Sequence, residues 1–215
     1  MAGLSERDER LRRRWDKQAA SYDKQMTFAD RHFFAETRPW VCSQATGDVL
    51  EVAIGTGLNL AYYPDGVRLT GVEWSPAMLA VARQRAADLG RQVDLRQGDA
   101  QALDFPAGSF DTVVCTFSLC AIPDDQRALI EMARVLRPGG LLLLADHVEA
   151  TAWPVRAVQR LLELVSVPLG GEYWRRRPIR YVRAMGFTIE RHERFKLGIL
   201  ERLTARKPLA RPGTG

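Results

Sequence analysis

The chain has 215 residues, of which 46% are hydrophobic and 27% are charged, which is typical of a soluble globular protein. This length fits one domain with a substantial buried core. No run approaches the roughly 18 apolar residues of a membrane span, and the charged N-terminus lacks the apolar segment of a signal peptide. Cys42, Cys115 and Cys120 form neither a metal-binding spacing nor a disulfide framework, and Cys115 and Cys120 are expected in the core or in a pocket wall. We therefore expect a cytoplasmic protein with no metal site.

The net charge of +5 is distributed unevenly. Residues 151–215 carry 14 basic and 5 acidic side chains, a balance of +9, whereas residues 49–150 have a balance of −5. Such a basic third can bind an anionic partner, namely nucleic acid, a lipid headgroup or an acidic substrate, or it can form a solvated helix surface. The Arg175–Arg177 run allows the same two readings, a solvated face or an anion contact.

The first segments are expected to be helical. Leu11, Trp15, Ala19 and Tyr22 recur at the spacing of one helix face, and Pro39 restarts or kinks a second helix over residues 30–40. From residue 49 onward, apolar runs alternate with helical segments. The predicted strands are 49–53, 68–73, 93–97, 110–116 and 141–146, and the predicted helices are 58–63, 75–90 and 124–136. This alternation predicts an α/β fold with a Rossmann-like, doubly wound, mostly parallel sheet.

The last third departs from this alternation. It predicts a helix over 153–167, a turn at Gly170–Gly171, a helix over 177–185, and an antiparallel edge hairpin of strands 187–194 and 199–207. The single domain 1–215 is thus expected to comprise a helical lid (1–45), a cofactor-binding core (46–150), a segment of helices and edge hairpin (151–207) and a disordered tail (208–215).

The stretch Val49–Gly57, V-L-E-V-A-I-G-T-G, is the most informative part of the chain. An apolar run ends there in a glycine turn, and sixteen residues after Gly57 a second apolar run ends in Glu73. Glycines let the backbone approach a ligand closely, and a carboxylate at the end of the next strand can accept hydrogen bonds from both hydroxyls of a ribose. The pattern predicts a nucleotide-like ligand at the carboxyl ends of the strands.

A dinucleotide is disfavoured as that ligand. Its fingerprint G-x-G-x-x-G has a third glycine, where G-T-G-L-N-L places Leu60. Other strand ends offer groups suited to an adenosine: Asp99 can accept from an exocyclic amine, and Trp74 and Met78 can flank an aromatic ring.

Five ordered motifs resemble those of the class I S-adenosylmethionine-dependent methyltransferases. They are E-V-A-I-G-T-G, G-V-E-W-S, G-D-A, S-F-D-T-V-V-C-T and L-R-P-G-G-L-L-L. The segment Trp15–Asp23, W-D-K-Q-A-A-S-Y-D, resembles the lid of the small-molecule branch that includes the ubiquinone/menaquinone methyltransferases. More weakly, V-V-C-T-F-S-L-C-A-I-P-D and A-D-H-V-E-A resemble thiol methyltransferases and bacterial phospholipid N-methyltransferases. The resemblance covers roughly residues 15–146.

This resemblance implies S-adenosylmethionine as cofactor and assigns residues to it. Glu73 is expected to hold the ribose, and Tyr22 to close over the cofactor carboxylate. The other residues expected to contact the cofactor are Glu51, Ala53, Gly55 and Gly57 at the methionine portion, Trp74, Met78, Asp99 and Ala100 at the adenine, and Thr116 near the sulfonium. Ala53 departs from the family, which usually has glycine there, so its methyl group is expected to narrow the methionine pocket.

The expected reaction is methyl transfer to a small, apolar or aromatic acceptor with an O, N or S nucleophile. The acceptor pocket is expected between the N-terminal helices, the loop Ser118–Pro123 and the segment 147–174, whose aromatic residues are Trp15, Phe28, Phe33, Phe34, Trp153, Tyr173 and Trp174. His147 is either a catalytic base or a structural histidine. A membrane surface is a possible but unnecessary partner, and a monomer or homodimer is expected.

Two rival functions belong to other classes. One is a module that binds the cofactor without turnover. The other is a phospholipid or nucleic-acid methyltransferase that uses the basic C-terminal third. Nucleic acid is disfavoured because the fourth strand ends T-F-S-L, without the Asn/Asp-Pro-Pro-aromatic tetrapeptide common in enzymes that methylate nucleic-acid amines.

Overall fold

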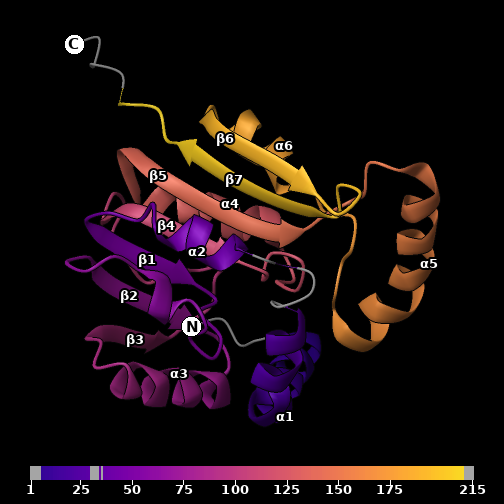
Figure 1. Cartoon of the computed structure of the whole chain (residues 1–215), viewed down its shortest axis with the longest axis horizontal. Helices are drawn as coiled ribbons and strands as arrows, with labels where there is room; N and C mark the ends of the chain where they lie inside the picture. The colour runs from indigo at the N-terminus through magenta and orange to yellow at the C-terminus, as the bar shows by residue number, and fades with distance from the viewer. Residues whose placement is uncertain (1–5, 30–33, 35, 211–215) are drawn as a thin grey trace.

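Seven strands form one sheet in the order β3-β2-β1-β4-β5-β7-β6 in a computed structural model that describes residues 6–29, 34 and 36–210. The first five strands pair in parallel, β7 pairs antiparallel with β5, and β6 pairs antiparallel with β7 (Figure 1). The strands are β1 Asp48–Val52, β2 Arg68–Glu73, β3 Val93–Gln97, β4 Phe110–Thr116, β5 Leu136–His147, β6 Thr188–Phe195 and β7 Leu200–Arg206. The predicted doubly wound sheet with an antiparallel edge hairpin is confirmed.

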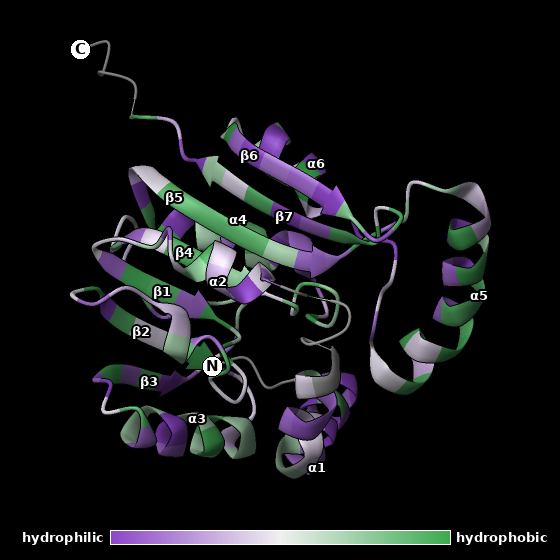
Figure 2. Ribbon diagram, viewed as in Figure 1, coloured by the Kyte–Doolittle hydropathy of each residue, from purple (hydrophilic) through white to green (hydrophobic). Residues whose placement is uncertain are grey.

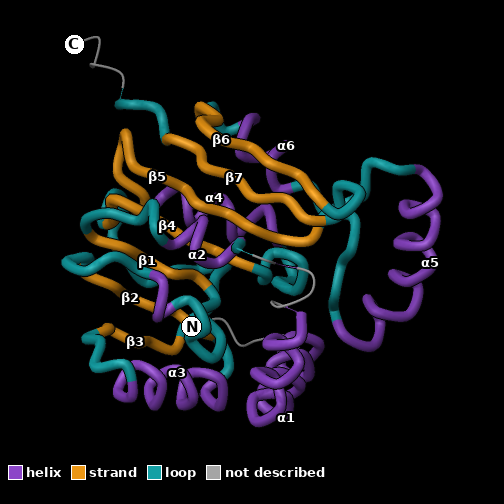
Figure 3. Tube along the Cα trace, viewed as in Figure 1, coloured by secondary structure: helices purple, strands orange, loops and turns teal. Residues whose placement is uncertain are grey.

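Helices lie before and between these strands (Figure 3). They are α1 Glu6–Ala29, α2 Thr37–Cys42, the short 3-10 helix η2 Leu60–Tyr62, α3 Pro76–Asp88, α4 Asp125–Val135, α5 Trp153–Gly170 and α6 Pro178–Ala184. Local signals explain the start of α3, where the Ser75 side chain accepts a hydrogen bond from the backbone N–H of Met78 (3.1 Å) and Pro76 takes the first helical position. The expected helix over 58–63 is only the single turn η2.

Both faces of the sheet are covered, as the continuously apolar strands predict. Leu50 and Val113 belong to a core cluster shared with α4 and α6, whereas their neighbours Val49 and Val114 belong to a second cluster shared with α2 and η2. This alternation follows from the two-residue period of a strand.

One strand is longer than expected. The sequence R-P-G-G predicts a turn between α4 and a strand beginning at Leu141, but β5 already begins at Leu136. The backbone N–H of Gly139 donates to the carbonyl of Lys207 at 3.0 Å, and the N–H of Lys207 donates to the carbonyl of Gly140 at 3.0 Å. Pairing with the C-terminal strand therefore absorbs the expected turn. Of the expected disordered tail 208–215, residues 211–215 lie outside the described part.

Candidate cofactor site

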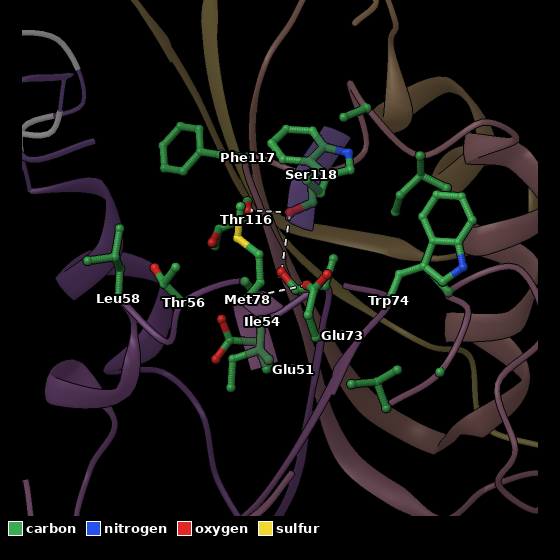
Figure 4. A pocket seen from close by; sticks show the side chains of 18 of the residues that line it. Glu51, Ile54, Thr56, Leu58, Glu73, Trp74, Met78, Thr116, Phe117 and Ser118 are labelled. Atoms are coloured by element: carbon green, nitrogen blue, oxygen red, sulfur yellow. Dashed lines mark hydrogen bonds between the residues drawn. The ribbon is translucent and has the colours of Figure 1, made fainter. Parts of the chain in front are cut away.

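A cavity opens at the carboxyl ends of β1, β2 and β4, next to the point where the strand order reverses from β1 to β4 (Figure 4). Ligands of open α/β sheets bind at such switch points. Ten of the twelve residues predicted for the site line this cavity: Tyr22, Glu51, Ala53, Gly55, Glu73, Trp74, Met78, Asp99, Ala100 and Thr116. Gly57 and His147 do not line it.

Glu73 ends β2 and faces the glycine turn after β1. Its Oε2 accepts a hydrogen bond from the backbone N–H of Gly55 at 2.9 Å, and its Oε1 accepts from that of Ser75 at 2.8 Å. Burial raises the pKa of this carboxyl, and the backbone hydrogen bonds oppose the rise. An ionised carboxylate has about four acceptor positions, so Glu73 retains acceptor capacity for a hydroxyl donor from the cavity beside these backbone donors.

The glycine turn leaves open space on its cavity side. A Cβ on Gly55 would meet nothing within 4 Å, and the residue has a φ of 60°. The backbone there is accessible to a ligand, which fits the close approach expected of the methionine portion of the cofactor. Gly57 has another place: a Cβ on it would come within 2.8 Å of the Leu60 side chain, so this glycine allows tight packing behind the cavity.

Ala53 adopts a conformation that favours glycine. Its φ is 55°, in the left-handed region that costs an L-residue roughly 1–2 kcal/mol. Phe117, at the end of β4, has a similar φ of 52°. Both residues line the cavity, which is where backbone strain tends to persist in functional proteins.

A buried polar network lies beneath the methionine end of the cavity. Glu51 accepts from the side-chain amide of Asn59 at 2.7 Å and from the Tyr63 hydroxyl at 2.9 Å. Asn59 in turn accepts from Arg38 at 2.9 Å and donates to the Thr116 hydroxyl at 2.9 Å. Burial is the largest cause that raises the pKa of Glu51 to about 7, against the hydrogen bonds that stabilise its charge. Sequence reasoning missed Arg38, Asn59 and Tyr63.

Helix α1 lies over the cavity and is fastened to the core by two aspartates. Asp16 accepts from the Ser75 hydroxyl at 2.6 Å, at the start of α3. Seven residues later, Asp23 accepts from the Thr56 hydroxyl at 2.6 Å and forms an ion pair with Arg85. The residues that precede these aspartates, Trp15 and Tyr22, line the cavity with ring centroids 6.2 Å apart. In both pairs of the sequence, W-D and Y-D, the aromatic residue thus lines the cavity and the aspartate binds α1 to the core.

The adenine end has the expected composition. Met78 is buried, Trp74 is half-buried, and both line the cavity with Asp99 and Ala100. One oxygen of Asp99 accepts from the backbone N–H of Gln101 at 2.8 Å, which fixes the carboxylate at the end of β3. These residues fit an adenosyl group: a carboxylate for the ribose, a second acceptor for an amine, and apolar walls for the ring.

The rest of the cavity is lined by the loop that follows β4. Phe117, Ser118, Ala121, Ile122 and Pro123 contribute to its wall, and the Phe117 ring stacks on Phe34 at a centroid distance of 4.2 Å. This loop is part of the predicted acceptor pocket. No residue of the described segment 147–174 lines this cavity, so the place of that segment in an acceptor pocket stays a prediction. Trp153 is instead 73% exposed, and Phe33 lies outside the described residues.

The Arg175–Arg177 run supports this loop from behind. Arg176 donates to the carbonyl oxygens of Leu119 (2.5 Å), Ile122 and Pro123 (2.8 Å). Its neighbours are half-buried and face carboxylates, with Arg175 2.6 Å from Glu163 and Arg177 3.6 Å from Glu201. The run is therefore neither the solvated face nor the anion contact that the sequence predicted.

His147 lies at the end of β5, outside the cavity lining. Its Nδ1 lies 3.5 Å from an oxygen of Asp146, and its ring packs against Trp174 at a centroid distance of 4.5 Å. Its Nε2 is buried, with no hydrogen-bond partner among the described residues. His147, Asp146 and Cys120 offer nitrogen, oxygen and sulfur atoms within 4.8 Å of one another, a cluster that their spacing of 26 residues did not predict.

That cluster is already internally bonded. Asp146 accepts from the backbone N–H of Cys120 at 3.1 Å and from that of His147 at 2.8 Å. Burial, and next the charge of Asp146, hold the pKa of the Cys120 thiol well above its usual range. Both carboxylate oxygens of Asp146 are thus already engaged within the protein.

Comparison with known proteins agrees with this geometry. Residues 50–144 match the family described as "Methyltransferase domain". A phosphatidylethanolamine N-methyltransferase of Cereibacter sphaeroides is 42% identical over 58% of this chain and 62% of its own length. A demethylmenaquinone methyltransferase of Renibacterium salmoninarum is 34% identical over 73% of this chain and 67% of its own length, and a human thiol S-methyltransferase is 34% identical over 61% and 56%. The chain thus spans about half to two thirds of the length of these curated relatives.

Solved structures share the fold at low sequence identity. A SAM-dependent methyltransferase of Thermotoga maritima, described as a possible histamine N-methyltransferase, has a TM-score of 0.69 at 21% identity over 90% of this chain and 98% of its own. The [4+2]-cyclase SpnF has a TM-score of 0.68 at 23% identity over 85% and 82%. These structures show the fold. The matched methyltransferase domain and the 34% identical Renibacterium salmoninarum methyltransferase show, with the motifs that line the cavity, that the chain belongs to the class I S-adenosylmethionine-dependent methyltransferases, whose cofactor is S-adenosylmethionine.

Proposed function

We propose that this protein transfers the methyl group of S-adenosylmethionine to a small, apolar or aromatic acceptor. The observation that carries the proposal is one cavity whose lining combines two kinds of surface. Glu73 and Asp99 supply hydrogen-bond acceptors, while Phe117, Ala121 and Ile122 supply apolar surface from the loop after β4.

The sulfonium of the bound cofactor supplies an activated methyl group, so the protein has chiefly to align the acceptor with it. Proximity and orientation can contribute on the order of 7–11 kcal/mol. Glu51, Gly55 and Glu73 hold the cofactor in this proposal, and Thr116, at the end of β4, lines the same cavity. Trp15 and Tyr22 of α1 exclude water, with α1 held in place by the Asp16 and Asp23 contacts.

The proposed acceptor class follows from the wall of the loop, and the relatives agree with it. Their names include a phosphatidylethanolamine N-methyltransferase, demethylmenaquinone methyltransferases and thiol S-methyltransferases. A ring, an acyl chain or an apolar thiol fits such a wall better than a sugar does. The hydroxyl groups of a sugar would lose water there without gaining hydrogen-bond partners.

An acceptor screen that follows S-adenosylhomocysteine release tests the proposal. The panel contains apolar thiols, phenols, a demethylmenaquinol analogue, amines and phosphatidylethanolamine. Turnover is expected with at least one apolar acceptor and not with sugars. If the protein binds S-adenosylmethionine yet turns over no acceptor of the panel, the proposal fails and the chain is a cofactor-binding module.

We propose that the need for His147 as a catalytic base depends on the acceptor. It does not line the cavity, so we expect His147→Asn to retain turnover of a thiol within a few-fold. A base that removes a proton in the transition state contributes typically 10²–10⁴-fold. A loss of that size, with a changed pH profile, would assign His147 the catalytic role that the sequence allows.

Nucleic acid is disfavoured as acceptor by the ion pairs of the basic third. Arg202 pairs with Glu193 at 2.5 Å and Arg206 with Glu190, so these two guanidinium groups are already engaged within the edge hairpin. Affinity for RNA or DNA that falls steeply with salt would revive this alternative.

A further inference from the structure

Helix α5 faces the protein with its polar side. Its buried Gln159 donates to the carbonyl oxygens of Val148 (2.9 Å) and Trp174 (3.1 Å) and accepts from the backbone N–H of Ala150 at 2.9 Å. One turn on, Glu163 accepts from the backbone N–H of Trp174 at 2.8 Å and pairs with Arg175. At the next turn, the Ser166 hydroxyl donates to the carbonyl of Glu172 at 2.9 Å. Positions i, i+4 and i+7 form one helix face, so this face anchors α5.

The opposite face of α5 is apolar and exposed. Figures 1 and 2 show the helix standing beside the sheet rather than against it. Leu161 is 65% exposed, Leu164 69%, and Val165 60%. The other large apolar side chains exposed on this helix are Trp153, Val158, Leu162 and Leu169. Most of the exposed large hydrophobic side chains of the described residues therefore lie on this one helix, in an arrangement inverted relative to an ordinary surface helix.

Basic residues border this apolar face. Arg156 and Arg160 are exposed and lie one turn apart. The acidic residue of α5, Glu163, is turned toward the protein and paired with Arg175. Near the other end of the helix, Arg14 of α1 donates to the carbonyl of Leu169 at 2.6 Å. The exposed surface of α5 thus combines apolar side chains with positive charge, which is the composition of helices that lie in a membrane interface.

The shape of the surface also favours a bilayer. A helix of 18 residues is about 27 Å long, and its exposed apolar side chains follow its length from Trp153 to Leu169. A single convex helix offers a rigid partner little to grip, whereas a fluid interface adapts to it.

From this geometry we propose that α5 is a membrane-docking helix, which inserts its apolar face into the interface of a bilayer containing anionic lipids. Among the described helices, none combines the length and apolar character needed to cross a bilayer. This inference does not depend on which acceptor the cavity takes.

Sedimentation with lipid vesicles tests the proposal on the full chain. Vesicles of phosphatidylcholine mixed with phosphatidylglycerol are compared with vesicles of phosphatidylcholine alone. The variant Leu161→Glu/Val165→Glu places charge on the apolar face, and Ile130→Glu on α4 is the matched control because Ile130 is 52% exposed. The wild type and the control are expected to bind the mixed vesicles. In the double variant, the affinity for these vesicles is expected to fall by about tenfold or more for each altered side chain.

Charge reversal supplies the second arm. Arg156→Glu/Arg160→Glu is expected to abolish the preference for anionic vesicles while a weaker affinity for neutral vesicles remains. Trp153 gives a direct readout: vesicles should shift its emission to shorter wavelength, and the shift should be missing from Trp153→Phe. S-adenosylmethionine affinity should be unchanged in every variant, which separates a failure here from a failure of the proposed function.

Three results would overturn the proposal. The first is a wild type that does not bind the mixed vesicles, and the second is a Leu161→Glu/Val165→Glu variant that binds them as well as the wild type does. The third is a wild-type dimer, seen in light scattering, that becomes a monomer in this variant, because the apolar face would then be covered by a second copy of the chain.

Discussion

Replacing Glu73 should weaken binding of S-adenosylmethionine far more than it weakens the fold. The carboxylate lies at the end of β2 and lines the cavity, and the N–H groups of Gly55 and Ser75 each donate to a different oxygen of it. A hydrogen bond to a charged group is worth about 1.5–3 kcal/mol, so two ribose hydroxyls correspond to about 3–6 kcal/mol. Glu73→Ala is therefore expected to raise Kd by roughly 10²–10⁴-fold, measured by isothermal titration calorimetry.

Glu73→Gln keeps the shape and one acceptor oxygen, so its expected loss is smaller, about 10–100-fold. Glu131→Gln is the matched control, since Glu131 is also buried and accepts from a backbone N–H, that of Leu103 at 2.9 Å, outside the cavity. Thermal unfolding shows whether each variant is folded. Unchanged affinity in folded Glu73→Ala, or an equal loss in Glu131→Gln, would refute this account of the ribose site.

Three further outcomes are expected. Ala53→Gly should relieve the left-handed backbone strain and raise the free energy of unfolding by about 1 kcal/mol in urea titrations, and a destabilised variant would contradict the strain. Burial raises the pKa of Glu51 to about 7 from an ordinary value of 4.5, so the folded state binds the extra proton between these values and stability from this group falls as pH rises from about 4.5 to 7. A decrease of about 3 kcal/mol in the free energy of unfolding over this pH range should be seen in the wild type and be absent from Glu51→Gln. Parallel profiles of unfolding free energy against pH for the two proteins would contradict this prediction. Chelation with EDTA should leave methyl transfer unchanged, because both oxygens of Asp146 already accept backbone hydrogen bonds, and activity restored by a metal after chelation would show that the cluster with Cys120 and His147 is a metal site.

The parts of the fold that sequence alone predicts are those with a local cause. The Ser75 cap with Pro76 fixes the start of α3, and the apolar run before Gly55 fixes β1. Residues whose partner lies far along the chain were not predictable in this way. Gly139 and Gly140 read locally as a turn, and only the carbonyl and N–H of Lys207, across the sheet, make them part of β5.

The site divides along the same line. The position of strand ends and glycine turns in a doubly wound sheet follows from the sequence pattern, which is why ten predicted residues line the cavity. Asn59 joins Glu51, Arg38 and Thr116, but its contribution depends on partners up to 57 residues away. The aromatic Trp153 shows the converse: its chemistry suits a pocket, yet α5 turns it outward because Gln159 and Glu163 anchor the other face.

Titration of the purified wild-type chain with S-adenosylmethionine, S-adenosylhomocysteine and NAD in a calorimeter tests the central claim most directly. The cavity with Glu73, Asp99 and the glycine turn predicts one site per chain for S-adenosylmethionine, competition by S-adenosylhomocysteine, and no detectable binding of NAD. Failure to bind S-adenosylmethionine, or tighter binding of NAD, would contradict the account.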